Sequence, residues 1–217
     1  MNSQIKHAEK RVGTALEAVL VLGDVGLFSS ELKRFFRRRG GRFARPVFYI
    51  EGNHEDHQSL THLASAYRDV MCHWQRGTVH RIGGMGFLAI GGAAYMDAHM
   101  TPMGAEITAR DVNRCLRYDP VAIDVVISHD CPAGIGVPGT KGFEHYGPPG
   151  FQGGDRIAAH VQPTLWLFGH HHAWFDRTID GIRYCGLPRS WEGYGLLGPD
   201  FAFEYVFNPL SPACDYG

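Results

Sequence analysis

Five polar side chains able to bind a metal ion stand just beyond short apolar runs, several of which end in glycine. Ligands of open α/β sheets bind beyond the carboxyl ends of the strands, so these side chains are predicted to converge on one rim. Oxygen and nitrogen ligands without a thiolate suit Mn²⁺, Fe²⁺, Co²⁺ or Zn²⁺ and argue against a structural zinc site. We predict an open, reactive metal cluster of Asp24, Asn53, His129, His170 and His172.

The segments that carry these residues resemble, in order, the motif blocks of calcineurin-like metallophosphoesterases. The blocks are Gly23-Asp24, Gly52-Asn53-His54-Glu55, Ser128-His129 and Gly169-His170-His171-His172. The resemblance implies a metal-dependent phosphoesterase that holds two divalent ions, with Mn²⁺ the first expectation. It further implies hydrolysis of a phosphate ester by in-line attack of a metal-bound hydroxide, without a covalent enzyme intermediate.

The resemblance also implies a role for each residue. Asp24 would bridge the two metals, Asn53, His129 and His170 would complete one of them, and His172 would bind the other. His54 would face the phosphate without binding metal, where an imidazole that titrates near neutrality can stabilise charge or protonate the leaving oxygen. Asp24 and His54 are thus the expected catalytic residues, and His171 should point away from the cluster because side chains of an extended chain alternate.

The family pattern begins with an Asp-x-His motif, and nothing before Asp24 matches it. We expect the chain to start downstream of that motif and to lack the first strand, which leaves one metal site incomplete. The alternative is therefore a catalytically impaired or inactive chain of the same fold that acts as a binding protein. Asp97-Ala98-His99 spells the motif but comes too late, so residues 91–104 are predicted to be a rim loop.

The expected partner is a small phosphate ester or a nucleotide, with monoester and diester both open. The blocks around Asn53 and His129 are also similar to RNA lariat debranching enzymes, which cleave a phosphodiester. A basic run over residues 33–45 could steer a nucleic acid, although a solvated helix face is the simpler interpretation. Residues 131–154 form a predicted overhanging loop in which His145 could contact substrate, while Cys131 is interpreted as structural.

Alternating helices and buried apolar strands predict an α/β fold, with two mixed sheets packed as a sandwich and flanked by helices. The whole chain, 1–217, is interpreted as one domain. The spacing predicts helices over 3–19, 29–39, 106–117 and 153–161. It predicts strands over 18–22, 47–50, 79–82, 87–90, 123–128, 164–168, 173–178, 182–186 and 201–207.

Composition places the chain among globular proteins, with 44% apolar and 20% charged residues in 217. A formal net charge of −1 gives the molecule no overall attraction for polyanions or anionic membranes. The five cysteines form no Cys-x-x-Cys pair, and we expect neither an export signal nor a membrane-spanning segment. A cytoplasmic protein with reduced thiols is expected, and its oligomeric state stays open.

Overall fold

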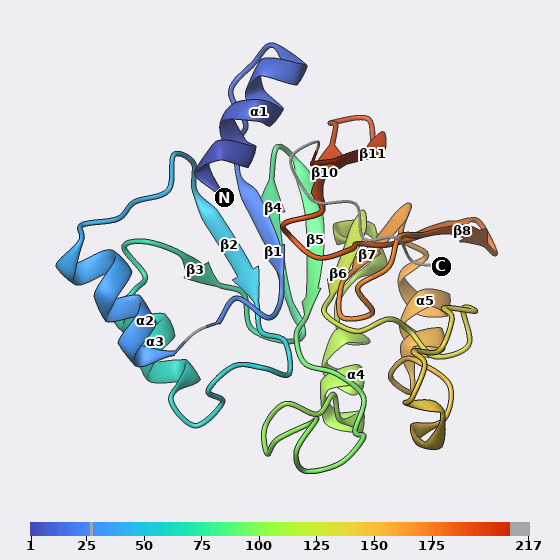
Figure 1. Cartoon of the computed structure of the whole chain (residues 1–217). Helices are drawn as coiled ribbons and strands as arrows, with labels where there is room; N and C mark the ends of the chain where they lie inside the picture. Colours follow the sequence, from blue (N-terminus) through green and yellow to red (C-terminus); the bar gives the residue numbers. More distant parts are fainter. Residues whose placement is uncertain (27, 209–217) are drawn as a thin grey trace.

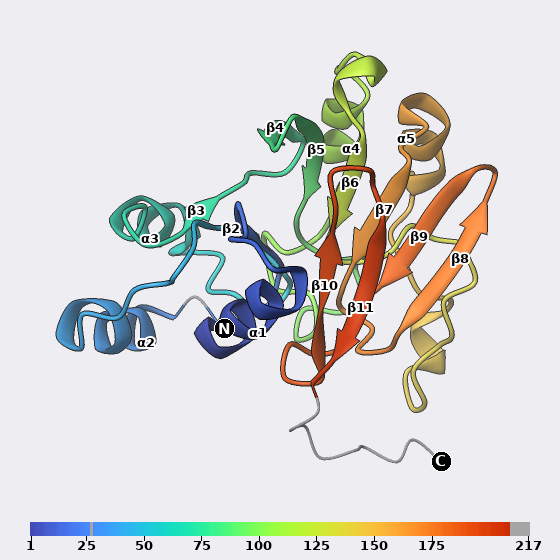
Figure 2. The same ribbon diagram turned by 90° about the horizontal axis from the view of Figure 1, so that it is seen from above.

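The computed structural model describes residues 1–26 and 28–208. Two β-sheets lie face to face in the middle of the molecule, and helices cover their outer sides (Figure 1). The view from above shows the remaining pair of strands, β10 and β11, beside helix α1 (Figure 2). No helix in the described part of the chain is long and apolar enough to cross a membrane.

The larger sheet has six strands in the order β4-β5-β6-β7-β9-β8. Its four central strands are parallel, and the strand at each edge runs antiparallel to its neighbour. Parallel strands place their carboxyl ends at one edge of the sheet, which is where the polar residues emerge. The strands are β4 (Thr78–Ile82), β5 (Met85–Ile90), β6 (Val125–Ser128), β7 (Leu165–Phe168), β8 (Phe175–Ile179) and β9 (Ile182–Gly186).

The smaller sheet is parallel throughout and has the order β1-β2-β3. Its strands are β1 (Val19–Leu22), β2 (Val47–Ile50) and the two-residue β3 (Cys72–His73). Leu22 lies opposite Ile50 in the register, so the two strands end side by side. A separate antiparallel hairpin joins β10 (Gly193–Leu197) to β11 (Phe203–Phe207).

The two sheets enclose a shared apolar core. Leu20 and Leu22 of β1 pack there with strand residues of the larger sheet, among them Phe87 and Ile127. Val19 and Val21 face the opposite side, toward the outer helices. Strand β1 therefore packs on both faces, as its continuous apolar run predicted, although its residues remain half-buried.

Helices complete the outer layers. Leu32 and Leu63 pack on the outer face of the smaller sheet, and Val112 and Ile157 pack on that of the larger sheet. The prediction of an α/β sandwich flanked by helices is confirmed, but only the larger of the two sheets is mixed, since the smaller one is parallel throughout. The helices are α1 (Asn2–Val12), α2 (Ser29–Leu32) with a π-helical continuation (Lys33–Arg38), α3 (Leu60–Ala66), α4 (Ala109–Cys115) and α5 (Gly154–Val161), with short 3₁₀ turns at Pro120–Ala122 and Glu144–Tyr146.

The first helix is shorter than predicted. The prediction of a helix over 3–19 was wrong beyond Val12, because Gly13 adopts a left-handed conformation (φ 73°) that ends the helix. Helix α4 likewise begins only at Ala109, where Thr108 and Asp111 form a capping box. Helix α3 and strands β3 and β10 were not predicted.

The basic run over residues 33–45 lies on and after the π-helical turn of the outer layer. Arg37 makes paired contacts to Asp69, at 2.8 and 2.7 Å. Three further arginines of the run also approach carboxylates. These are Arg34 with Glu31, Arg42 with Asp69 at 3.6 Å, and Arg45 with Glu9. Much of the positive charge of this run is thus paired with nearby carboxylates, which supports its interpretation as a solvated helix face.

Candidate metal centre

Four of the five predicted ligands meet between the two sheets. Asp24 follows β1 and Asn53 follows β2, while His129 follows β6 and His170 follows β7. The His129 Nε2 atom lies 3.1 Å from Asn53 Oδ1, 3.1 Å from His170 Nδ1 and 3.5 Å from Asp24 Oδ2. Each sheet therefore supplies two of the four side chains.

Hydrogen bonds outside the cluster fix which atoms face its centre. His129 Nδ1 lies 2.7 Å from the carbonyl oxygen of Leu22, so it carries the proton and leaves a lone pair on Nε2. Asn53 Nδ2 donates to the carbonyl oxygen of Met100 at 2.7 Å, which turns the amide oxygen inward. Such outer hydrogen bonds are the usual means of orienting metal ligands.

The result is a set of inward-facing acceptor atoms. The lone pair of His129 Nε2 faces Asn53 Oδ1 and Asp24 Oδ2, and neither of these oxygens carries a proton to share. Burial, ahead of the nearby charges, lowers the pKa of His170 to about 4, so its imidazole is neutral at pH 7. Acceptors that face one another repel, and a cation between them converts that repulsion into coordination. The residues present therefore fit a divalent metal ion with oxygen and nitrogen ligands.

The backbone is bent sharply to bring these side chains together. Asp24 and His170 both have positive φ angles, 51° and 64°, which are uncommon for residues other than glycine. Gly52 is needed for a different reason. A Cβ atom at this position would lie 2.1 Å from Asp24 Oδ1, so any side chain would push the carboxylate out of place.

The cluster forms part of the wall of a large cavity. Asn53 and His129 are buried, whereas Asp24 is exposed on the open side. The cavity holds about 950 Å³ and is lined by Asp24, His54 and His172 among others. The side chain of His54 is exposed, and its backbone N–H donates to Asp24 Oδ1 at 3.1 Å.

His172 is the predicted ligand that the structure sets apart. It lines the same cavity, but it does not belong to the group of mutually close ligand atoms formed by Asp24, His129 and His170 in the described residues. Desolvation, followed by the charge of Arg189, lowers the pKa of His172. Arg189 also lines the cavity, and the sequence reasoning missed it because it lies outside the motif blocks.

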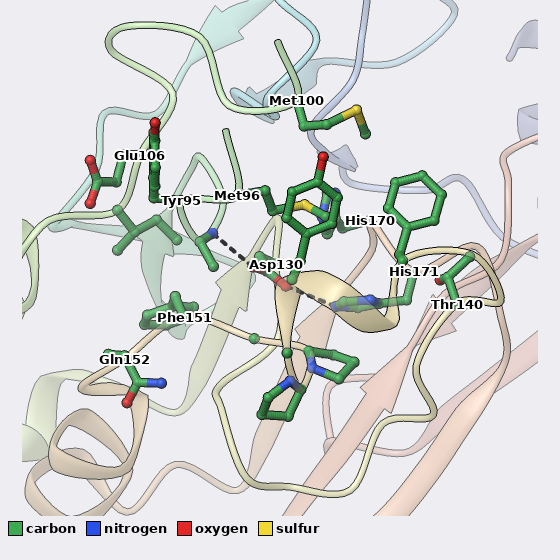
Figure 3. A pocket seen from close by; sticks show the side chains of 18 of the residues that line it. Tyr95, Met96, Met100, Glu106, Asp130, Thr140, Phe151, Gln152, His170 and His171 are labelled. Carbon is green, nitrogen blue, oxygen red and sulfur yellow. Dashed lines mark hydrogen bonds and ion pairs between the residues drawn. The ribbon is translucent and has the colours of Figure 1, made fainter. Parts of the chain in front are cut away.

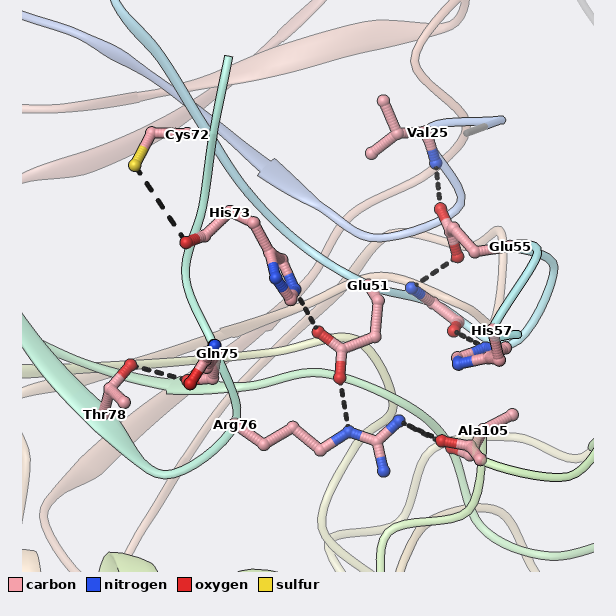
Figure 4. Close-up of polar contacts among 12 residues, drawn as sticks. Val25, Glu51, Glu55, His57, Cys72, His73, Gln75, Arg76, Thr78 and Ala105 are labelled. Carbon is pink, nitrogen blue, oxygen red and sulfur yellow. Dashed lines mark hydrogen bonds and ion pairs between the residues drawn. The ribbon is translucent and has the colours of Figure 1, made fainter. Parts of the chain in front are cut away.

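Two buried carboxylates brace the loops that carry the ligands (Figure 4). Glu55 accepts the backbone N–H of Val25 at 2.6 Å and that of Gly52 at 2.7 Å, so one side chain joins the ends of β1 and β2. Glu51 contacts His73 at 2.7 Å and also Arg76. The sequence reasoning included Glu55 in a motif block but gave it no role.

The buried position of Glu55 predicts an unusual dependence of stability on pH. Desolvation, and then the charge of Asp24, raises the pKa of Glu55 from 4.5 to about 7. Folding therefore takes up a proton between pH 4.5 and 7, so this residue makes the metal-free protein less stable as pH rises through that window. The total is on the order of 3 kcal/mol, from about 1.4 kcal/mol per pKa unit.

We expect Glu55→Gln to remove that slope, which urea unfolding at pH 5 and pH 8 would measure. The variant should also be less stable than the wild type at pH 5, by about 1–3 kcal/mol, because one backbone N–H loses its acceptor. Equal pH slopes for the two proteins would contradict this assignment.

His171 points away from the cluster, as predicted. Its Nε2 atom lies 2.8 Å from Asp130 Oδ1, and Asp130 also accepts backbone N–H groups from Ala94 and Cys131 (Figure 3). Burial opposes ionisation of Asp130, but the His171 hydrogen bond and the nearby histidines outweigh it and lower the pKa. Burial raises the pKa of the Cys131 thiol, consistent with a structural role for that cysteine.

The two predicted rim loops lie where expected. Residues of the 91–104 loop, including Tyr95 and Met100, line the cavity, and so does Tyr146 from the 131–154 loop. His145, the proposed substrate contact, is not among the described residues that line the cavity. Its ring lies against that of Tyr146 in a tilted arrangement, with centroids 3.9 Å apart. Asp97 lies in the first rim loop and outside the ligand cluster.

Solved structures share this fold at low sequence identity. One aligns with a TM-score of 0.63 at 12% identity, over 94% of this chain and 92% of the other. The protein TT1561 of Thermus thermophilus aligns with a TM-score of 0.59 at 12% identity, over 93% and 89%. A putative 5'-nucleotidase from Staphylococcus aureus gives 0.52 at 12% identity, over 95% of this chain and 46% of that one.

The sequence itself places the chain in a family. The sequence model of the calcineurin-like phosphoesterase family matches residues 4–174, a span that contains every residue of the cluster. The chain belongs to the calcineurin-like phosphoesterase family, which confirms the resemblance seen in the motif blocks. A search of curated proteins gave no match.

Proposed function

We propose that this protein hydrolyses phosphate esters, with a divalent cation held by Asp24, Asn53, His129 and His170. The observation that carries the proposal is the convergence of four oxygen and nitrogen atoms from the strand ends of two sheets, beside a cavity that Asp24 and His170 line. A bound divalent ion would act as a Lewis acid and lower the pKa of a coordinated water. Mn²⁺ is the cation we propose first, because the ligands are oxygens and nitrogens.

Residues of the chain would share the remaining work. His54 is exposed in the cavity beside Asp24, where its imidazole can reach a substrate oxygen and transfer a proton to it. Arg189 in the same wall offers a guanidinium, whose charge and planar donors suit a phosphate group. His172 lies at this end of the cavity and is proposed as a ligand of a second cation.

The size of the cavity bears on the substrate. A volume of about 950 Å³ is far more than a phosphate group needs, so the ester can carry a bulky second part. We propose a small organic phosphate, and a nucleotide is one such ester. The described cysteines Cys72, Cys115, Cys131 and Cys185 are free, which is consistent with a reducing compartment such as the cytoplasm.

A second function has one observation in its favour. His172 stands apart from the group of close ligand atoms, and Asp97-Ala98-His99 does not join that group. A chain with a single complete cation site would bind a phosphate ester without turning it over. This protein would then be a binding protein of the same fold.

The two functions are separated by activity at saturating metal. We expect the wild-type chain to hydrolyse p-nitrophenyl phosphate or bis(p-nitrophenyl) phosphate with added Mn²⁺. The Asp24→Asn variant should hydrolyse the same ester at least about 100-fold more slowly. Asp180→Asn is the matched control, because Asp180 lies exposed in the β8–β9 turn and its φ of 50° is tolerated by asparagine. Tight Mn²⁺ binding with hydrolysis of neither ester would favour the binding protein.

A further inference from the structure

The amide of Asn53 depends on a residue far along the chain for its orientation. Its Nδ2 atom donates to the carbonyl oxygen of Met100, 47 residues away, at 2.7 Å. An asparagine amide can rotate by half a turn with little change in shape, which would exchange its oxygen for its nitrogen. The Met100 carbonyl selects the orientation in which Oδ1 faces His129.

The Met100 carbonyl is in turn held by Asp97. Asp97 Oδ1 accepts the backbone N–H groups of His99 and Met100, both at 2.8 Å, and so forms a tight local turn. The backbone carbonyl of Asp97 also accepts from Thr101 at 2.8 Å. Thr101 is buried, and its hydroxyl donates to the carbonyl oxygen of Ala94 at 3.0 Å, which closes the loop on itself.

The second carboxylate oxygen of Asp97 is used by the opposite rim loop. Tyr146 OH donates to Asp97 Oδ2, a contact between two segments that lie 49 residues apart. Tyr146 and Met100 both line the cavity, so this contact joins the two loops beside it. The series runs from Tyr146 through Asp97 and Met100 to the side chain of Asn53.

We propose that Asp97 and Tyr146 are positioning residues for Asn53, so that contact between the two rim loops sets the affinity of the cluster for its cation. The proposal rests on the ligand role of Asn53 within the proposed function. It also accounts for Asp97, whose carboxylate forms part of an Asp-x-His sequence without joining the cluster. A substrate that displaces the Tyr146 hydroxyl would free the Asn53 amide to rotate. A substrate that leaves the hydroxyl in place would keep Asn53 Oδ1 facing the cluster.

A purely structural role for Tyr146 makes a different prediction. The hydroxyl would then contribute to the stability of the loop and have no specific link to Asn53. A double-mutant cycle separates the two cases, because residues that act through each other show non-additive effects. The partner variant is Asn53→Asp, which keeps a ligand oxygen but has no N–H to donate to Met100.

The experiment is a titration with Mn²⁺, followed by electron paramagnetic resonance of the free ion, on wild type, Tyr146→Phe, Asn53→Asp and the double variant. We expect Tyr146→Phe to weaken binding by about 3- to 10-fold in the wild-type background, less than the loss typical of a direct outer-shell partner. We expect no further weakening in the Asn53→Asp background. Tyr118→Phe is the control, since this tyrosine packs against the core beyond α4.

Other outcomes decide against the proposal. Unchanged affinity of Tyr146→Phe, or the same weakening in both backgrounds, would overturn it. Absence of Mn²⁺ binding by the wild type would overturn it together with the ligand assignment. We expect the metal-free wild type and Tyr146→Phe to have similar thermal unfolding temperatures. Because the readout is binding, the cycle gives its answer even if the protein hydrolyses no ester, a result that would refute the proposed function alone.

Discussion

His129→Ala is expected to weaken Mn²⁺ binding by at least about 100-fold. Loss of a residue that only orients a ligand typically weakens metal binding by about 10- to 100-fold, and this substitution removes a ligand itself. His129 is the central residue of the cluster, since its Nε2 atom lies within 3.5 Å of atoms of Asn53, His170 and Asp24. Calorimetric titration with Mn²⁺ would measure the loss, and hydrolysis should fall with it.

The matched control is His62→Ala, which removes an exposed imidazole on α3. Its Mn²⁺ affinity should equal that of the wild type. If His129→Ala bound Mn²⁺ as tightly as wild type, the cation would have to bind elsewhere. The convergence of acceptors between the sheets would then have no functional meaning.

His54→Ala is expected to lower kcat by about 10²- to 10⁴-fold, the usual contribution of a general acid or base, with Mn²⁺ affinity unchanged. The two effects separate because only the exposed side chain is lost. The backbone N–H of residue 54 continues to donate to Asp24 Oδ1, so the ligand keeps its position. Rates at saturating Mn²⁺ and a direct binding titration together test the assignment.

The conservative variant sharpens this test. His54→Gln keeps a polar side chain of similar reach but cannot transfer a proton near neutral pH, so its kcat should fall nearly as far as that of His54→Ala. A variant whose lost rate returned fully on raising the Mn²⁺ concentration would instead identify His54 as a ligand.

The convergence of the site was predictable from sequence because it follows from local features. Each of Asp24, Asn53, His129 and His170 stands just after a short apolar run, and parallel strands bring such positions to one edge. His172 also stands near this edge, but its own backbone is left-handed (φ 56°), which turns the chain there. Its distance from the group depends on that turn, which the order of motifs does not reveal.

Contacts between distant segments could not be predicted. The hydrogen bond from Asn53 to Met100 and that from Tyr146 to Asp97 join loops with no shared pattern in the sequence. Strand β3 has only two residues, and β10 contains two glycines, so neither shows the alternation of a strand. The error in the first helix had a visible cause. Glycine commonly ends helices, but the apolar spacing continued past Gly13 and hid this signal.

The origin of the four ligands in two sheets has a mechanical meaning. Asp24 and Asn53 follow strands of one sheet and His129 and His170 follow strands of the other, so a cation bound by all four is also a cross-link between the layers. Its binding free energy then adds to the apolar contacts that hold the layers together, and separation of the layers requires its release. Metal content and resistance to unfolding should therefore rise and fall together in this protein.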